Sequence, residues 1–227
     1  MPDQDPRLTF LDTLSAADRA AFLDSGRRRK WERGEAIARA GDRADSTIVL
    51  LTGLAKIHRV AADGSDVVLN LCGPGELLGE VTAIGPGRRS ASVTALESVE
   101  AVVLPVSDAH AFFTRHPQAS LALLDLALRR LRLADARRIE FATSESLGRV
   151  ASRVVELAER FGTHRQDGTI EVALAITQED LASWSASSRE STARALRTLR
   201  QLGLLETQRL RLTVRDLEGL RNHVARL

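Results

Sequence analysis

The sequence contains little cysteine, no tyrosine and no long apolar run. Its 227 residues include one cysteine, Cys72, which excludes a framework of disulfides within the chain. No stretch stays apolar over the roughly 20 residues that a membrane helix needs, and no apolar segment follows a charged N-terminus. We therefore expect a cytoplasmic protein with no membrane contact.

The sequence also lacks an arrangement of side chains suited to catalysis or to holding a metal. The five histidines are scattered without ligand spacing, and no nucleophile lies in a context that suggests a partner base. A single cysteine cannot hold an iron–sulfur cluster within one chain, and beside Leu71 the thiol fits a core position better. The sequence thus predicts a protein that is not an enzyme, and we expect no metal, haem or iron–sulfur cluster.

Positive charge is slightly concentrated in the last third of the chain. The formal net charge is only +2. From Gly148 onward, 13 arginines stand against 10 acidic residues, whereas 19 basic residues stand against 20 acidic ones before it. A small basic excess in the C-terminal part fits the binding of a polyanion such as DNA.

The stretch 177–205 predicts two short helices joined by a serine-rich turn. The first helix runs over 178–184, with Thr177 as its N-cap. The second, basic helix ends near Gly203, a residue type that favours a left-handed cap, and the alternating run after it predicts a small wing. An apolar stripe at spacings of three is expected to pack inward: Ala193, Leu196, Leu199 and Leu202.

The outward face of the second helix carries groups that read DNA bases. Arginine presents two donors that match O6 and N7 of guanine, and glutamate accepts from the amino group of cytosine. Arg189, Glu190 and Arg194 lie at the helix start, where the recognition helix of a helix-turn-helix touches base edges. The alternative is a solvated amphipathic helix whose charges only maintain solubility.

The run 187–194, SSRESTAR, resembles the recognition helix of the CRP/FNR bacterial transcription regulators, in the branch similar to the cyclic AMP receptor protein. The resemblance implies that Arg189 and Arg194 read guanines and that Glu190 reads a cytosine. It also implies a palindrome of half-sites similar to TGTGA, which requires a symmetric dimer. The phosphate contacts that it implies are Thr177 and Ser188.

Between 31 and 106 the sequence changes to short β-rich runs broken by glycines. Such spacing suits a small antiparallel roll. With Ala40-Gly41-Asp42 and Thr52-Gly53, the segment resembles the cyclic nucleotide-binding β-roll of the same regulators. We therefore predict a cyclic nucleotide-binding-type domain over 1–117.

The stretch 75–93 within this roll combines an anion-binding helix start with polar side chains. A short helix after Gly79 would aim backbone amides at a phosphate, Arg89 would pair with it, and Glu80 would accept from a ribose hydroxyl. The stretch resembles the family's phosphate-binding cassette, one residue shorter between Glu80 and Arg89, and it implies cAMP or cGMP as ligand. The matching positions are Gly79, Glu80, Arg89, Ser90 and Ala91. The alternative is a Glu80–Arg89 ion pair in a roll that binds nothing.

A long helix is predicted over 118–141, and leucines recur along it at alternating spacings of three and four. That spacing is typical of the seam of a two-stranded coiled coil, and it predicts a homodimer. The alternative is that the leucines pack only on their own roll. The seam positions are Leu121, Leu124, Leu128 and Leu131.

The next seam position is Asp135, where a carboxylate needs a partner such as Arg132, Arg138 or a ligand. By the family resemblance, Ala134-Asp135 stands in place of a Thr-Ser pair that contacts adenine, so one adenine contact is missing. Because a carboxylate matches the adjacent N–H donors of guanine, cyclic GMP is one hypothesis. A ligand-independent dimer, with Asp135 bound to arginine across the seam, is the other.

Hydroxyl and acidic residues at 143–146 interrupt the helical pattern and predict a hinge, so 118–146 is assigned to a dimerisation helix and hinge. A winged helix-turn-helix DNA-binding domain is predicted over 147–227. Within it, the loop Thr163–Gly168 resembles the family's RNA polymerase-contacting loop. An ordinary polar hairpin loop is the alternative.

The predicted fold is therefore α+β: an N-terminal cyclic nucleotide-binding β-roll, a long dimerisation helix and a C-terminal winged helix-turn-helix. We predict a sequence-specific DNA-binding transcription regulator that is controlled by a cyclic nucleotide bound in the roll. Two alternatives stay open. One is a regulator of the same kind that needs no ligand or responds to another effector; the other is a cyclic-nucleotide-binding interaction module that does not bind DNA.

Overall fold

The computed structural model describes residues 5, 7–81, 87–173, 175–208 and 211–225. The chain divides into two compact units. One comprises Leu8–Leu133, and the other comprises Ala134–Leu227 together with Met1–Arg7. The division falls inside the long helix, and the domain boundaries predicted at 117 and 146 stay predictions.

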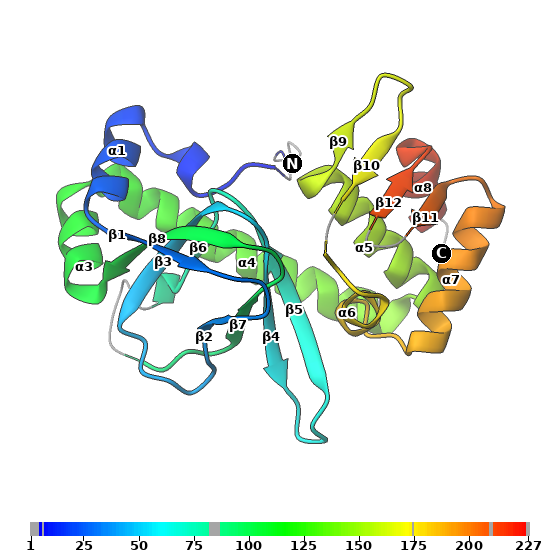
Figure 1. The fold of residues 1–227 in the computed structure, drawn as a ribbon, viewed down its shortest axis with the longest axis horizontal. Coiled ribbons are helices and arrows are strands. Elements are labelled where there is room, and N and C mark those ends of the chain that lie inside the picture. Colours follow the sequence, from blue (N-terminus) through cyan, green and yellow to red (C-terminus); the bar gives the residue numbers. More distant parts are fainter. Residues whose placement is uncertain (1–4, 6, 82–86, 174, 209–210, 226–227) are drawn as a thin grey trace. The chain divides into compact units, whose positions relative to one another are not determined.

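The first unit is built mainly of short strands, as the glycine-punctuated runs predicted (Figure 1). Its strands are β1 (Arg27–Trp31), β2 (Ala36–Ala38), β3 (Ser46–Thr52), β4 (Ala55–Val60), β5 (Asp66–Cys72), β6 (Leu77–Leu78), β7 (Ser92–Ala95) and β8 (Val99–Pro105). Its helical elements are a 3-10 turn (Leu11–Thr13), α1 (Ala16–Asp24), α3 (Val106–Arg115) and most of α4 (Pro117–Thr143). Two antiparallel sheets form, in the orders β1-β8-β3-β6 and β2-β7-β4-β5.

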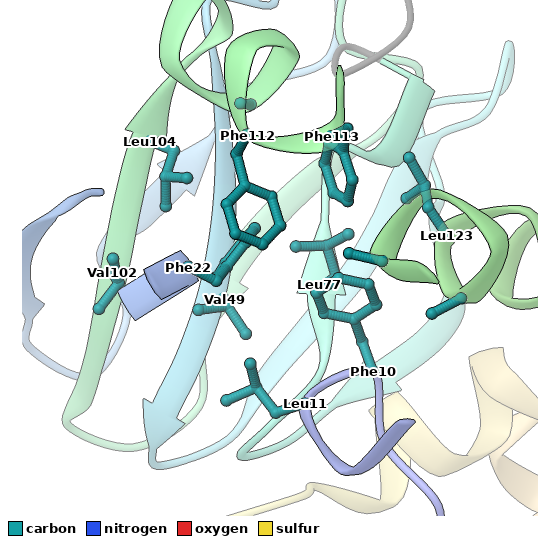
Figure 2. Packing of buried hydrophobic residues seen from close by; sticks show 13 residues of the cluster. Phe10, Leu11, Phe22, Val49, Leu77, Val102, Leu104, Phe112, Phe113 and Leu123 are labelled. Carbon is teal, nitrogen blue, oxygen red and sulfur yellow. The ribbon is translucent and has the colours of Figure 1, made fainter. Parts of the chain in front are cut away.

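One core cluster packs α1, α3 and the start of α4 on the sheet that contains β3 and β8 (Figure 2). The rings of Phe22 and Phe112 meet edge to face with centroids 5.0 Å apart, a geometry that aromatic pairs favour. A second cluster joins residues of both sheets and includes Trp31 and Cys72. The Cys72 thiol is 1% exposed, so the prediction of a core position is confirmed.

The long helix α4 buries one face and exposes the other. Ala119, Ala122 and Leu123 lie in the core cluster of the roll. The predicted seam positions are exposed in the single chain: Leu121 59%, Leu124 56%, Leu128 43% and Leu131 57%. The alternative that these leucines pack only on their own roll is therefore wrong.

The second unit contains the predicted winged helix-turn-helix. After the end of α4 follow α5 (Ser146–Phe161), β9 (Thr163–His164), β10 (Ile170–Val172), α6 (Gln178–Trp184), α7 (Arg189–Gln201), β11 (Leu205–Gln208), β12 (Arg211–Val214) and α8 (Leu217–Val224). The four strands form one antiparallel sheet in the order β11-β12-β10-β9. The hairpin β11–β12 is the predicted wing, although its residues 209–210 lie outside the described part of the chain.

The buried face of α7 matches the predicted stripe at two of its four positions, and the predicted Ala193 is only half-buried. Leu196 and Leu199 are buried, and they are joined by Thr192 and Ala195. Leu202 is 53% exposed and caps the end of the helix, so its predicted inward packing was wrong. A spacing of three falls short of the 3.6 residues of a turn, and three such steps carry a side chain to about the opposite face.

A buried ionic network fastens the last turns of α4 to α5. The Glu156 carboxylate accepts hydrogen bonds from Arg137 of α4 and from Arg153 and Arg160 of its own helix. Arg153 also donates to Glu140 of α4, at 2.7 Å. The guanidinium groups of Arg137 and Arg153 lie 5.6 Å and 5.5 Å from the ring centroid of Trp184, the last residue of α6. The same buried charged cluster therefore contacts the end of α4, helix α5 and the last residue of α6.

Candidate DNA-binding and nucleotide-binding sites

The first helix of the helix-turn-helix starts with a complete capping box. The Thr177 hydroxyl accepts a hydrogen bond from the Asp180 backbone amide at 3.0 Å, and the Asp180 carboxylate accepts one from the Thr177 amide at 3.1 Å. These two bonds satisfy amides that the first turn of a helix leaves free. Thr177 is exposed, as a phosphate contact requires, and it is held in place before DNA arrives.

The predicted base-reading residues lie together at the start of α7. Ser188 is its N-cap and accepts from the Ser191 amide at 3.0 Å. Arg189, Glu190 and Arg194 are all exposed, and Arg194 Nη2 lies 3.0 Å from Glu190 Oε1. Residues four apart share one face of a helix, so arginine and glutamate are presented to the same surface. This arrangement offers bidentate donors and an acceptor side by side, as reading of base edges needs.

In the roll, a hollow brings together most of the predicted cassette. A cavity of about 110 Å³ is lined by residues of β4, β6 and β7, by Arg130 of α4 and by all the cassette positions named in the sequence: Gly79, Glu80, Arg89, Ser90 and Ala91. The short helix predicted after Gly79 falls partly on 82–86, which lie outside the described residues. The amide donors expected there stay a prediction.

Arg89 is held at the edge of this cavity by the roll itself. Its guanidinium donates to the Ser46 carbonyl at 2.7 Å and to the Ser46 hydroxyl at 2.9 Å. Burial lowers the pKa of Arg89, and the nearby carboxylates of Asp45 and Glu80 oppose that shift. A buried guanidinium whose nearest carboxylate oxygen, on Asp45, lies 3.9 Å away retains the charge to attract an anion.

Glu80 pairs with Arg130 and not with Arg89. Arg130 Nη1 lies 2.5 Å from Glu80 Oε2, so the alternative of a Glu80–Arg89 ion pair was wrong. Burial disfavours the charge on Arg130, but Glu80 outweighs it and holds the pKa of Arg130 above its ordinary value. Sequence reasoning missed Arg130 because fifty residues separate it from the cassette. The only signal was an arginine on the helix that follows the roll.

The other predicted contacts stay untested. Asp135 is exposed, and within the described residues it forms no ion pair in its own chain. It belongs to the second unit and the cassette to the first, so its predicted ligand contact stays a prediction. The loop Thr163–Gly168 forms an ordered hairpin tip, in which the Asp167 carboxylate accepts from the Thr169 amide at 3.0 Å. A contact of this loop with RNA polymerase stays a prediction too.

Two features are absent from the part of the chain that the structure describes. No cluster of three or more histidine, cysteine, aspartate or glutamate side chains is placed to hold a metal ion. Among the same residues, no helix combines the length and the apolar character needed to cross a membrane.

A β-roll with a cassette cavity, a long helix and a winged helix-turn-helix define the class of nucleotide-sensor-type transcription regulators. Comparison with known proteins agrees. Residues 28–116 match the family model of the cyclic nucleotide-binding domain, and residues 148–223 match that of the Crp-like helix-turn-helix domain.

Two relatives and one solved structure show how far the similarity extends. The CRP-like cAMP-activated global transcriptional regulator of Mycobacterium tuberculosis is 30% identical over 190 residues, covering 84% of each chain. The cyclic AMP receptor protein of Thermus thermophilus is 30% identical over 178 residues, covering 78% of this chain and 79% of its own. The structure of FixK2 from Bradyrhizobium japonicum has the same fold, with a TM-score of 0.78 at 19% identity over 87% of this chain and 96% of that one.

The chain therefore belongs to the CRP/FNR family of transcription regulators. Its C-terminal unit is a DNA-binding helix-turn-helix, and its family consists of regulators and not of enzymes.

Proposed function

We propose that this regulator binds, as a homodimer, a palindrome of half-sites similar to TGTGA. Arg189 and Arg194 read guanines, Glu190 reads a cytosine, and two hydroxyl residues hold the flanking phosphates: Thr177 and Ser188. The observation that carries the proposal is the exposed Glu190–Arg194 pair one turn into α7. Arginine and glutamate at that point of a recognition helix match the edges of G·C pairs in the major groove.

The dimer forms through α4. Four exposed leucines on a helix that already buries its other face in the roll leave an apolar stripe in water. Pairing with the same stripe of a second chain removes that surface from water, and it brings two recognition helices to a two-fold site. We place this dimer in the cytoplasm, with its DNA.

The effector is a cyclic nucleotide bound in the cassette cavity. Arg89 faces its phosphate, Glu80 its ribose hydroxyl, and Ser90 and Ala91 complete the wall behind Gly79. The names of the two relatives point to cAMP for those proteins. In this chain Ala134-Asp135 replaces the adenine-contacting pair, and a carboxylate there fits the N–H edge of guanine, so cGMP is included beside cAMP.

A ligand-independent regulator is the second candidate, and two contacts favour it. Glu80 is already paired with Arg130, and Arg89 is already bonded to Ser46. The charged groups of the cavity therefore need no ligand to offset their burial.

The test is fluorescence anisotropy with a duplex of two TGTGA half-sites and a scrambled duplex, at one fixed salt concentration. Each is titrated without nucleotide, with cAMP and with cGMP. Preference for the palindrome only in the presence of one nucleotide supports control through the roll. Equal preference without nucleotide supports the second candidate. Equal affinity for both duplexes in every condition overturns the proposed site.

A further inference from the structure

The turn between α6 and α7 is held in a conformation that its sequence disfavours. Ala186 has φ 47°, and it is the non-glycine residue with positive φ among those described. For a residue with a Cβ, this left-handed region is higher in free energy than the right-handed one, because the Cβ crowds the following carbonyl oxygen. Some contact outside the turn has to compensate.

Arg149, near the start of α5, supplies that contact. Its Nε donates to the Ser185 carbonyl at 2.9 Å, and its Nη2 donates to the Ala186 carbonyl at 3.0 Å. Its Nη1 donates to the carbonyl of Ser144, the residue that follows α4. One guanidinium thus ties three backbone carbonyls together, two from the turn and one from the predicted hinge.

We propose that Arg149 is a positioning residue for DNA recognition, which fixes the turn, and with it the start of α7, relative to the hinge. The inference rests on the proposed function, since it concerns how the base-reading residues are oriented. Arg149 itself is half-buried, and its three side-chain nitrogens make five hydrogen bonds to carbonyls and hydroxyls of its own chain. It therefore acts through the turn and not as a DNA contact.

Geometry, and not charge, is what the fork of Arg149 supplies. Lysine keeps the charge but cannot donate to three carbonyls in a fixed plane. Glycine at position 186 adopts the left-handed region without strain. If Arg149 holds Ala186 there, Ala186→Gly reduces the need for Arg149, and the two positions are coupled.

The experiment is a double-mutant cycle in the full-length protein, read by affinity for the palindrome. Arg149→Gln and Arg149→Lys each weaken binding about tenfold or more, because charge-assisted hydrogen bonds to the backbone carbonyls of the turn and the hinge are lost. Ala186→Gly recovers about threefold or more in the Arg149→Gln background and changes the parent less than about twofold. Full affinity in Arg149→Lys, or an equal effect of Ala186→Gly in both backgrounds, overturns the proposal.

Hydrogen exchange of the free protein separates this inference from the proposed function. The Ser187 amide donates to the Ala182 carbonyl across the turn at 2.9 Å. Arg149→Gln speeds its exchange about tenfold or more, whereas Arg160→Gln, about three turns along α5, lowers global stability without that local effect. If Arg149→Gln leaves the exchange rate of the Ser187 amide unchanged, the positioning role of Arg149 is wrong, whether or not the parent protein binds DNA.

Discussion

Arg137 of α4 donates to both carboxylate oxygens of Glu156 of α5, each at 3.1 Å. The pair fixes the end of α4 to the helix that carries Arg149. The sequence predicted a hinge at 143–146, between these two residues, and the network shows that the helices on either side of it are bonded to each other. Residues 143–146 therefore connect two helices of one unit that are bonded to each other, and we call this connection with its Glu156 network the α4–α5 joint.

The stability of this joint depends on pH through Glu156. Burial opposes ionisation, but Arg137, Arg160 and Arg153 together hold the pKa of Glu156 below its ordinary value of 4.5. A lowered pKa means that the stabilisation is complete above the ordinary value and is lost as the pH falls through the lowered one.

We expect Glu156→Gln to lower the free energy of unfolding at pH 7 by about 3 kcal/mol, since it leaves buried arginines unpaired. The difference in the free energy of unfolding between parent and variant becomes smaller as the pH falls below about 4.5. Urea unfolding from pH 7 to pH 3 measures it, with the exposed Glu179→Gln as control. A gap that stays constant with pH contradicts the assignment.

Disruption of the leucine stripe is expected to dissociate the dimer. Leu124→Glu or Leu128→Glu places a carboxylate in an apolar seam, and dimerisation weakens by at least about a hundredfold. Sedimentation equilibrium measures the constant. Val60→Glu, at a residue 63% exposed on β4, is the matched control and should leave it unchanged. A dimer that survives both leucine substitutions must form elsewhere.

Substitution of Arg189 tests base reading. Arg189→Ala should weaken binding to the palindrome about tenfold or more while leaving affinity for scrambled DNA nearly unchanged, because a bidentate base contact carries sequence discrimination. Arg200→Ala removes a positive charge from the last turn of α7, and it should weaken binding to the palindrome and to the scrambled duplex equally. If Arg189→Ala also weakens binding to the two duplexes equally, Arg189 contacts phosphate and not guanine.

Calorimetry with cAMP and cGMP tests the cavity of the roll. Arg89→Gln should reduce nucleotide affinity at least about tenfold by removing a charge-assisted phosphate contact. Arg59→Gln changes an exposed arginine of β4 that does not line the cavity, and it should have little effect. Absence of heat in the parent protein with both nucleotides would leave the ligand-independent candidate standing.

Local signals predicted the helix-turn-helix almost residue by residue. Thr177 is the N-cap that the sequence predicted, and Gly203, with φ 72°, lies just after the end of α7 as predicted. The capping role of Ser188 was not predicted, although the base-reading residues were placed at the helix start that it caps. The roll was predictable at the level of its glycine-broken runs. Contacts between distant segments were not. Arg130 reaches the cassette, and Arg149 reaches the turn, only once packing has brought helices against loops that periodicity does not relate to them.

The two tryptophans lie in different units. Trp31 is 6% exposed among the strands of the roll, whereas Trp184 is 2% exposed under the guanidinium groups of Arg137 and Arg153. The chain has no tyrosine, so ultraviolet emission comes from these two indoles. Trp31→Phe leaves a fluorophore that reports unfolding of the DNA-binding unit, and Trp184→Phe leaves one that reports unfolding of the β-roll unit. Each of the two units thus contains one tryptophan whose fluorescence can follow the unfolding of that unit alone.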